Sequence, residues 1–210
     1  MAAALAAGLA ASGTRVAAFK PALTGIDEPA DSRWPRDDEL LSAVTGQRPG
    51  DIAARRFGPA VSPHLAAALA GGELDPAELL AGARAAAAHV DAIVVEGVGG
   101  ILVPLTPRYS VRDFARDLGL AVVIAARPGL GTINHTLLTL EALRAADLHV
   151  VGVVLTPWPD EPGELERSNR HTIAELGHVE VATLPHLADA DPRGLACAGA
   201  ALPLQRWLVT

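Results

Sequence analysis

Cysteine is almost missing from this sequence, since Cys197 is the single one among 210 residues. One cysteine excludes an internal disulfide and any metal site built from several cysteines, and it is typical of proteins of a reducing cytoplasm. Aromatic residues are also scarce at 3%, while alanine, leucine and valine make up most of the 50% that is hydrophobic. This composition favours helices that pack closely on a sheet.

An excess of positive charge is missing too, because the formal net charge is -7 at pH 7. Non-specific nucleic-acid binding needs a basic face and is therefore not expected, whereas a few local donors are enough to bind a small anion. No run reaches the ~18 apolar residues of a membrane span. A signal peptide would have basic residues before its apolar run, and the alanine-rich start of this chain has none. We predict a cytoplasmic protein without nucleic-acid or membrane partners.

Short apolar runs alternate with helical patterns along the whole chain. The expected strands cover residues 15–20, 92–96, 121–126, 150–155 and 179–185. The expected helices cover residues 2–11, 37–44, 62–71, 75–90, 110–119, 129–147, 163–176 and about 199–208. Continuous apolar strands that alternate with helices predict an α/β fold, with a mostly parallel sheet and helices on both faces. Residues 26–36 and 157–163 are expected to be surface loops, and residues 1–210 a single domain.

Ligands of such sheets bind where the strands end, at their carboxyl ends. Lys20 ends the first expected strand and is followed by "PALTG", which adds the hydroxyl of Thr24. A lysine there either keeps its ammonium group in water or places a cation over an anion-binding crevice. Glu96 ends the next strand, before "GVGG". It is either a turn residue or a magnesium ligand beside glycines that let a phosphate approach the backbone.

Two helix starts also carry candidate groups. Asp37, Asp38 and Glu39 open the helix expected at residues 37–44. Acidic residues stabilise a helix N-terminus, so this function and magnesium binding are both open. The stretch "GLGTINH" places backbone N–H donors at the start of the helix expected at residues 129–147, where a carboxylate or phosphate could bind. Asn134 and His135 would otherwise be ordinary residues of the first turn.

Together these motifs resemble one known family. "VAAFKPALTG", "RDDELL", "SPHLAA", "VVEGVGGILVPL", "GLGTINHTLLTLEAL" and "GVVLTPWPD" occur in the order and spacing of dethiobiotin synthetases, over nearly the whole chain. The resemblance implies a P-loop-NTPase-like fold and a homodimeric ligase of biotin biosynthesis that uses Mg²⁺ and ATP. It also implies the reaction, in which 7,8-diaminopelargonate takes up CO2 as a carbamate, ATP phosphorylates the carbamate, and the second amine closes a cyclic urea.

The resemblance assigns catalytic and metal-binding positions. Lys20 matches the catalytic lysine, which would stabilise carbamate and phosphoryl charge. Asp37 matches the first magnesium carboxylate, with its neighbour Asp38 as the less favoured candidate, and Glu96 matches the second. The turn that lines the phosphate site matches Gly97, Val98 and Gly99. Val98 stands where the family usually has alanine, and we expect it to crowd this turn.

The resemblance also assigns binding positions for substrate and nucleotide. Thr24 matches a hydroxyl that contacts the substrate. A loop that grips the substrate carboxylate across the dimer interface matches Thr132, Ile133 and Asn134. The positions beside the nucleotide base match Thr156, Pro157, Pro185, His186 and Leu187. Since the family often has Asn-Asp at the first two of these, we expect the nucleotide preference to be loose.

A GxxxxGK[ST] phosphate loop does not occur in residues 1–210. The family begins with a strand and such a loop, and "MAAALAAGLAASG" resembles the helix that follows them. We expect Met1 to be an internal methionine or a misassigned start, the neighbouring strands to have unpaired edges, and this chain to bind MgATP poorly and turn over little. Two alternatives stay open: a non-catalytic paralogue that acts as a binding or regulatory protein, and another amidoligase-like or ParA-like relative.

Overall fold

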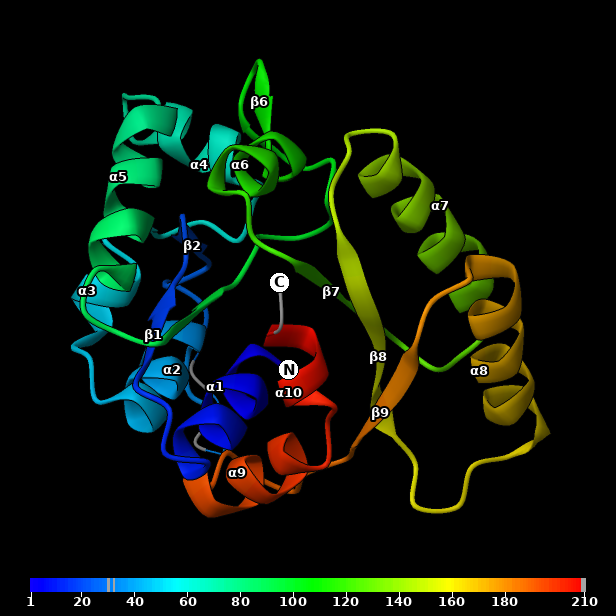
Figure 1. The fold of residues 1–210 in the computed structure, drawn as a ribbon. Coiled ribbons are helices and arrows are strands. Elements are labelled where there is room, and N and C mark those ends of the chain that lie inside the picture. The colour runs from blue at the N-terminus through cyan, green and yellow to red at the C-terminus, as the bar shows by residue number, and fades with distance from the viewer. Residues whose placement is uncertain (30, 32, 209–210) are drawn as a thin grey trace.

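The computed structural model describes residues 1–29, 31 and 33–208, and helices alternate with strands along the chain (Figure 1). The strands are β1 (Val16–Phe19), β2 (Leu23–Thr24), β3 (Arg56–Phe57), β4 (Ala92–Val95), β5 (Pro104–Thr106), β6 (Tyr109–Ser110), β7 (Val122–Ala126), β8 (Val150–Trp158) and β9 (Val181–Pro185). The helices are α1 (Ala2–Ala11), α2 (Asp37–Thr45), α3 (Pro49–Ile52), α4 (Pro63–Leu69), α5 (Pro76–Ala87), α6 (Val111–Leu118), α7 (Thr132–Arg144), α8 (Glu164–Gly177), α9 (Pro192–Ala200) and α10 (Leu204–Leu208).

The long strands pair in parallel, which confirms the predicted α/β fold. β1 pairs with β4 from Val16↔Ala92 to Phe19↔Val95 without a break in register. β7, β8 and β9 form a three-stranded parallel sheet. Short β2 and β3 pair in parallel, while β5 and β6 form an antiparallel hairpin. In the part of the chain that the structure describes, no helix has the length and apolarity needed to cross a membrane.

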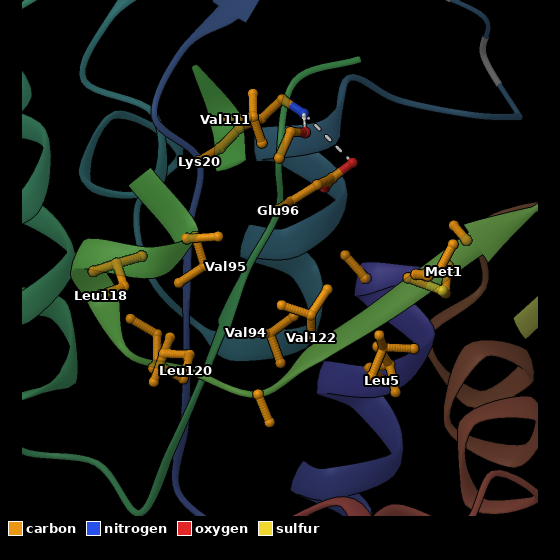
Figure 2. Close-up of a pocket in the computed structure, with 18 of the residues that line it drawn as sticks. Met1, Leu5, Lys20, Val94, Val95, Glu96, Val111, Leu118, Leu120 and Val122 are labelled. Atoms are coloured by element: carbon orange, nitrogen blue, oxygen red, sulfur yellow. Dashed lines mark hydrogen bonds and ion pairs between the residues drawn. The ribbon is translucent and has the colours of Figure 1, made fainter. Parts of the chain in front are cut away.

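The parallel strands form two half-sheets rather than one continuous sheet. Among the described residues, β4 pairs only with β1, and β7 pairs only with β8. A cavity of about 930 Å³ lies between these edges, lined by β4, β7, α1 and α6 (Figure 2). Both edges that face the cavity therefore keep backbone N–H and C=O groups without strand partners, as the sequence predicted.

Helix α1 lies between the two half-sheets and packs against β1, β4, α2, α9 and α10 (Figure 1). Its residues from Ala2 to Leu9 are all buried, as expected for a helix that is apolar all round. The approach to α9 is closest at two glycines. A Cβ atom added at Gly8 would lie 2.6 Å from the carbonyl carbon of Gly199, so the two backbones touch.

The C-terminal region differs most from the prediction. Instead of one helix at about 199–208, the structure has α9 and α10. Asp191 caps helix α9, which begins at Pro192, and the Asp191 carboxylate accepts a hydrogen bond from the backbone N–H of Gly194 at 3.0 Å. The same Asp-Pro pair at residues 75–76 predicted the start of α5. The small residues that follow Pro192 have no clear hydrophobic periodicity, so α9 was not predicted with these bounds.

Candidate active site

Lys20 lies at the centre of a charged cluster at the carboxyl ends of β1 and β4. Its ammonium Nζ is 2.8 Å from Asp37 Oδ2 and 3.4 Å from Glu96 Oε1, and it donates a 3.5 Å hydrogen bond to the carbonyl of Gly97. The in-register pairing of Phe19 with Val95 explains the approach of Lys20 to Glu96, because each residue directly follows its strand. Figure 2 shows this pair at one end of the cavity.

Burial and charge compensation define the electrostatics of this cluster. Lys20 is only 4% exposed, so its ammonium group depends on the two carboxylates in place of water. Burial raises the pKa of Glu96, an effect that the charge of Lys20 opposes and the charge of Asp37 reinforces. One cation and two carboxylates are thus held within ion-pair distance at the edge of a mostly aliphatic cavity.

The two adjacent aspartates of α2 have different surroundings. Asp37 opens the helix with its side chain 47% exposed and pairs with Lys20. Asp38 is fully buried and pairs with the guanidinium group of Arg56 on β3. The structure therefore places Asp37, and not Asp38, beside Lys20 and Glu96.

The turn after Glu96 approaches its surroundings closely through glycine. A Cβ atom at Gly97 would lie 3.1 Å from Val111, and one at Gly99, where φ is +70°, would lie 3.0 Å from Val103. Val98 packs, partly buried, against the hydrophobic cluster that contains Phe114. Val98 also lines the cavity, and the expected crowding of the turn stays a prediction.

The other predicted residues fall into two groups. Thr24 and Thr156 line the same cavity as Lys20, together with the 97–99 turn. The remaining ones do not line it: Thr132, Ile133, Asn134, Pro157, Pro185, His186 and Leu187. Thr132 is buried in the first turn of α7, Asn134 is exposed, and His186 donates its backbone N–H to the carbonyl of Trp158 at 3.1 Å.

Asn169 on α8 is a buried polar residue that the sequence did not indicate. It is 5% exposed, and its Nδ2 donates hydrogen bonds to the carbonyls of Pro128 at 2.8 Å and Gly129 at 3.3 Å. These carbonyls belong to the loop that leads into α7. Asn169 lies in a polar helical stretch, where nothing distinguishes a buried asparagine from a solvated one.

Carboxylates near Lys20 are the candidate metal ligands of this site. No group of three or more His, Cys, Asp or Glu side chains in the described ranges is arranged to hold one. Mg²⁺ commonly binds through one or two carboxylates and completes its coordination with water and substrate phosphates. Asp37 and Glu96, both close to Lys20 Nζ, fit this chemistry.

Comparisons with known proteins show the family of the chain. A family described as an AAA domain (AAA_26) matches residues 1–193. A protein of Anaeromyxobacter sp. (strain Fw109-5), named ATP-dependent dethiobiotin synthetase BioD, is 39% identical over 188 residues, which cover 84% of this chain and 82% of the relative. The chain belongs to the dethiobiotin synthetase family.

Two further relatives of the dethiobiotin synthetase family carry the same name. One from Rhodopseudomonas palustris (strain BisA53) is 40% identical over 182 residues, covering 86% of this chain and 78% of the relative. One from Mycobacterium sp. (strain KMS) is 37% identical over 197 residues, covering 90% of this chain and 83% of the relative. The predicted family, its enzymatic nature and the P-loop-NTPase-like fold class are thereby confirmed, while the roles of single residues stay predictions.

Proposed function

We propose that this chain is an ATP-dependent ligase that forms dethiobiotin from 7,8-diaminopelargonate, CO2 and ATP. One observation carries the proposal: in a chain of this family, Lys20, Asp37 and Glu96 converge where two paired parallel strands end. A buried ammonium group between two carboxylates offers a cation for anionic oxygens and oxygen ligands for a metal. Phosphoryl transfer depends on both kinds of group.

The proposed reaction has three balanced steps. One amine of diaminopelargonate adds to CO2 and loses a proton, which gives a carbamate. The γ-phosphoryl group of ATP passes to a carbamate oxygen and leaves ADP. The second amine then attacks the carbamoyl carbon, phosphate departs, and loss of a proton completes the cyclic urea.

Lys20 is the proposed catalytic residue. Its ammonium group would stabilise the negative charge of the carbamate and of the transferring phosphoryl oxygens, which is the main way proteins accelerate such transfers. Asp37 and Glu96 would hold Mg²⁺, which supplies charge neutralisation of the nucleotide phosphates. The low exposure of Lys20 supports this role, because electrostatic stabilisation is stronger where water is excluded.

The remaining assignments follow the family resemblance. Thr24 would contact the substrate from the cavity that Lys20 lines. Thr132, Ile133 and Asn134 would grip the substrate carboxylate across a homodimer interface. The nucleotide base would lie beside Thr156, Pro157, Pro185, His186 and Leu187, and the enzyme would act in the cytoplasm.

The test is dethiobiotin formation by the purified chain from diaminopelargonate, bicarbonate and MgATP, measured by mass spectrometry. We expect slow formation, because residues 1–210 hold no GxxxxGK[ST] motif. Lys20→Gln should lower the rate by about 100-fold or more. Arg48→Gln is the control, since the Arg48 side chain is 85% exposed and pairs only at the surface.

Two results would contradict the proposal. An unchanged rate in Lys20→Gln would remove Lys20 from the catalytic role. Binding of diaminopelargonate by calorimetry without any product above the enzyme-free control would favour the non-catalytic binding protein instead.

A further inference from the structure

The start of helix α2 is connected to Lys20 by two separate routes. The direct route is the 2.8 Å ion pair between Asp37 and Lys20. The second route leaves Asp38, crosses its ion pair to Arg56 on β3, and passes from β3 to β2. β2 begins at Leu23, shortly after Lys20 in the chain. The contacts therefore form a closed ring that includes both partners of the active-site ion pair.

Asp38 is the most deeply buried member of this ring. It is 0% exposed, whereas the Arg56 side chain is 33% exposed. Oδ2 of Asp38 faces Arg56, and Oδ1 has no hydrogen-bond partner among the described residues. A buried carboxylate needs a compensating charge, and here the guanidinium group of Arg56 provides it. The position of Asp38 is thus tied to the position of Arg56.

Arg56 is in turn fixed to the segment that follows Lys20. It pairs with Leu23 in the parallel β2–β3 ladder, and the N–H of Leu23 donates to the carbonyl of Arg55 at 2.8 Å. A second arginine, Arg36, connects the same helix start to this segment, because its guanidinium group donates a hydrogen bond to the carbonyl of Ile26 at 2.8 Å. The start of α2 is therefore attached at two points to the chain around β2.

Asp37 has little packing of its own that would fix its place. Its side chain is 47% exposed, and it stands at the first position of a helix of 9 residues. Helix ends fray readily unless they are attached. The neighbouring residue Asp38 provides that attachment, since the backbone of one cannot move without the other.

We propose that the Asp38–Arg56 ion pair is a positioning device, which fixes the start of α2 and thereby aims the Asp37 carboxylate at Lys20 and Glu96. The pair touches none of the reacting groups and acts through the backbone of α2. This inference rests on the proposed function only for the use of Asp37 as a metal ligand. The placement of Asp37 is a separate claim with its own readout.

The first experiment measures amide hydrogen exchange in the first turn of α2. There the N–H of Leu40 donates to the carbonyl of Arg36 at 2.8 Å. Arg56→Met should accelerate exchange of the Leu40 amide by about tenfold or more, because the attachment is lost. Arg56→Lys, which keeps the charge, should restore most of the protection. Arg55→Met is the matched control, since the adjacent Arg55 forms an exposed pair with Glu78 on α5.

The second experiment measures binding of Mn²⁺ alone by electron paramagnetic resonance. Arg56→Met should weaken Mn²⁺ binding by about 10- to 100-fold, the range seen when supporting residues of metal sites are removed. In an Asp37→Asn background, Arg56→Met should have no further effect, because the residue it positions is gone. A general loss of stability would weaken binding equally in both backgrounds.

Each outcome decides a different claim. If the Leu40 amide exchanges at the same rate in Arg56→Met and in Arg55→Met, the positioning role is wrong. If exchange accelerates but the wild-type chain binds no Mn²⁺, the positioning role stands and the proposed metal site fails. Should Arg56→Met not fold, the double variant Asp38→Asn/Arg56→Gln replaces it, since it leaves no buried charge unpaired.

Discussion

The close crossing of α1 and α9 gives a sharp prediction for Gly199→Ala. A Cβ atom at Gly199 would overlap the carbonyl oxygen of Ala4 and lie 2.8 Å from its carbonyl carbon and 3.0 Å from the backbone nitrogen of Gly8. These are backbone atoms, so no side chain can rotate away. Overpacking typically costs 1–3 kcal/mol, and we expect Gly199→Ala to lower the free energy of unfolding by about 3 kcal/mol.

Gly194→Ala in the same helix is the control for this prediction. A Cβ atom there has Asp191 Oδ2 as its nearest neighbour, at 3.8 Å. Alanine should stabilise the helix by roughly 0.5–1 kcal/mol, because it has less backbone entropy to lose than glycine. Both values come from urea unfolding, with the m-value compared between variants. Equal stabilities of the two variants would show that α1 and α9 do not touch backbone to backbone.

Two further predictions concern single contacts. The guanidinium group and the backbone N–H of Arg15 donate hydrogen bonds to the Asp91 carboxylate, and they lower its pKa from 3.8 to about 2. Asp91 therefore stabilises the fold above pH 3.8, and this stabilisation is lost as the pH falls through 2. The difference in Tm between wild type and Asp91→Asn should therefore be full at pH 7, shrink as the pH falls below 3.8 and vanish below pH 2; a constant difference would contradict the ion pair. Asn169→Ala should cost about 1–3 kcal/mol in urea unfolding, because the partly buried carbonyls of Pro128 and Gly129 lose their donor. Protection of amides 129–135 from hydrogen exchange should fall with it, and unchanged protection would show that the loop is held elsewhere.

The parts of the structure with strong local signals were predictable from the sequence. The run "RVAAFK" is continuous and apolar, and it forms β1 at Val16–Phe19. The apolar start forms α1 at Ala2–Ala11, as the helix formers before Ser12 indicated. The approach of Lys20 to Glu96 was also predictable, because the carboxyl ends of parallel strands lie at one edge.

Contacts that depend on tertiary packing were not predictable. Asp37 and Asp38 are chemically identical neighbours at a helix start, yet one faces Lys20 and the other is buried against Arg56. Adjacent helical residues point in different directions, but the sequence does not say which direction faces the sheet. Short β3, which carries Arg56, gave no signal because two residues are too few for a periodic pattern.

The division of the strands into two half-sheets affects how the molecule should unfold. In a continuous sheet, strand pairing carries cooperativity from one side to the other. Here the pair β1 and β4 and the sheet β7–β9 each have one hydrophobic cluster of their own. A third cluster joins them through α1, because it contains α1 residues together with Ala18 of β1 and Val154 of β8, and α9 packs on both α1 and β9. Mechanical coupling between the halves thus passes through helices. Pulling the halves apart in a single-molecule experiment should give two force peaks instead of one, with the α1–α9 contact as the first to yield.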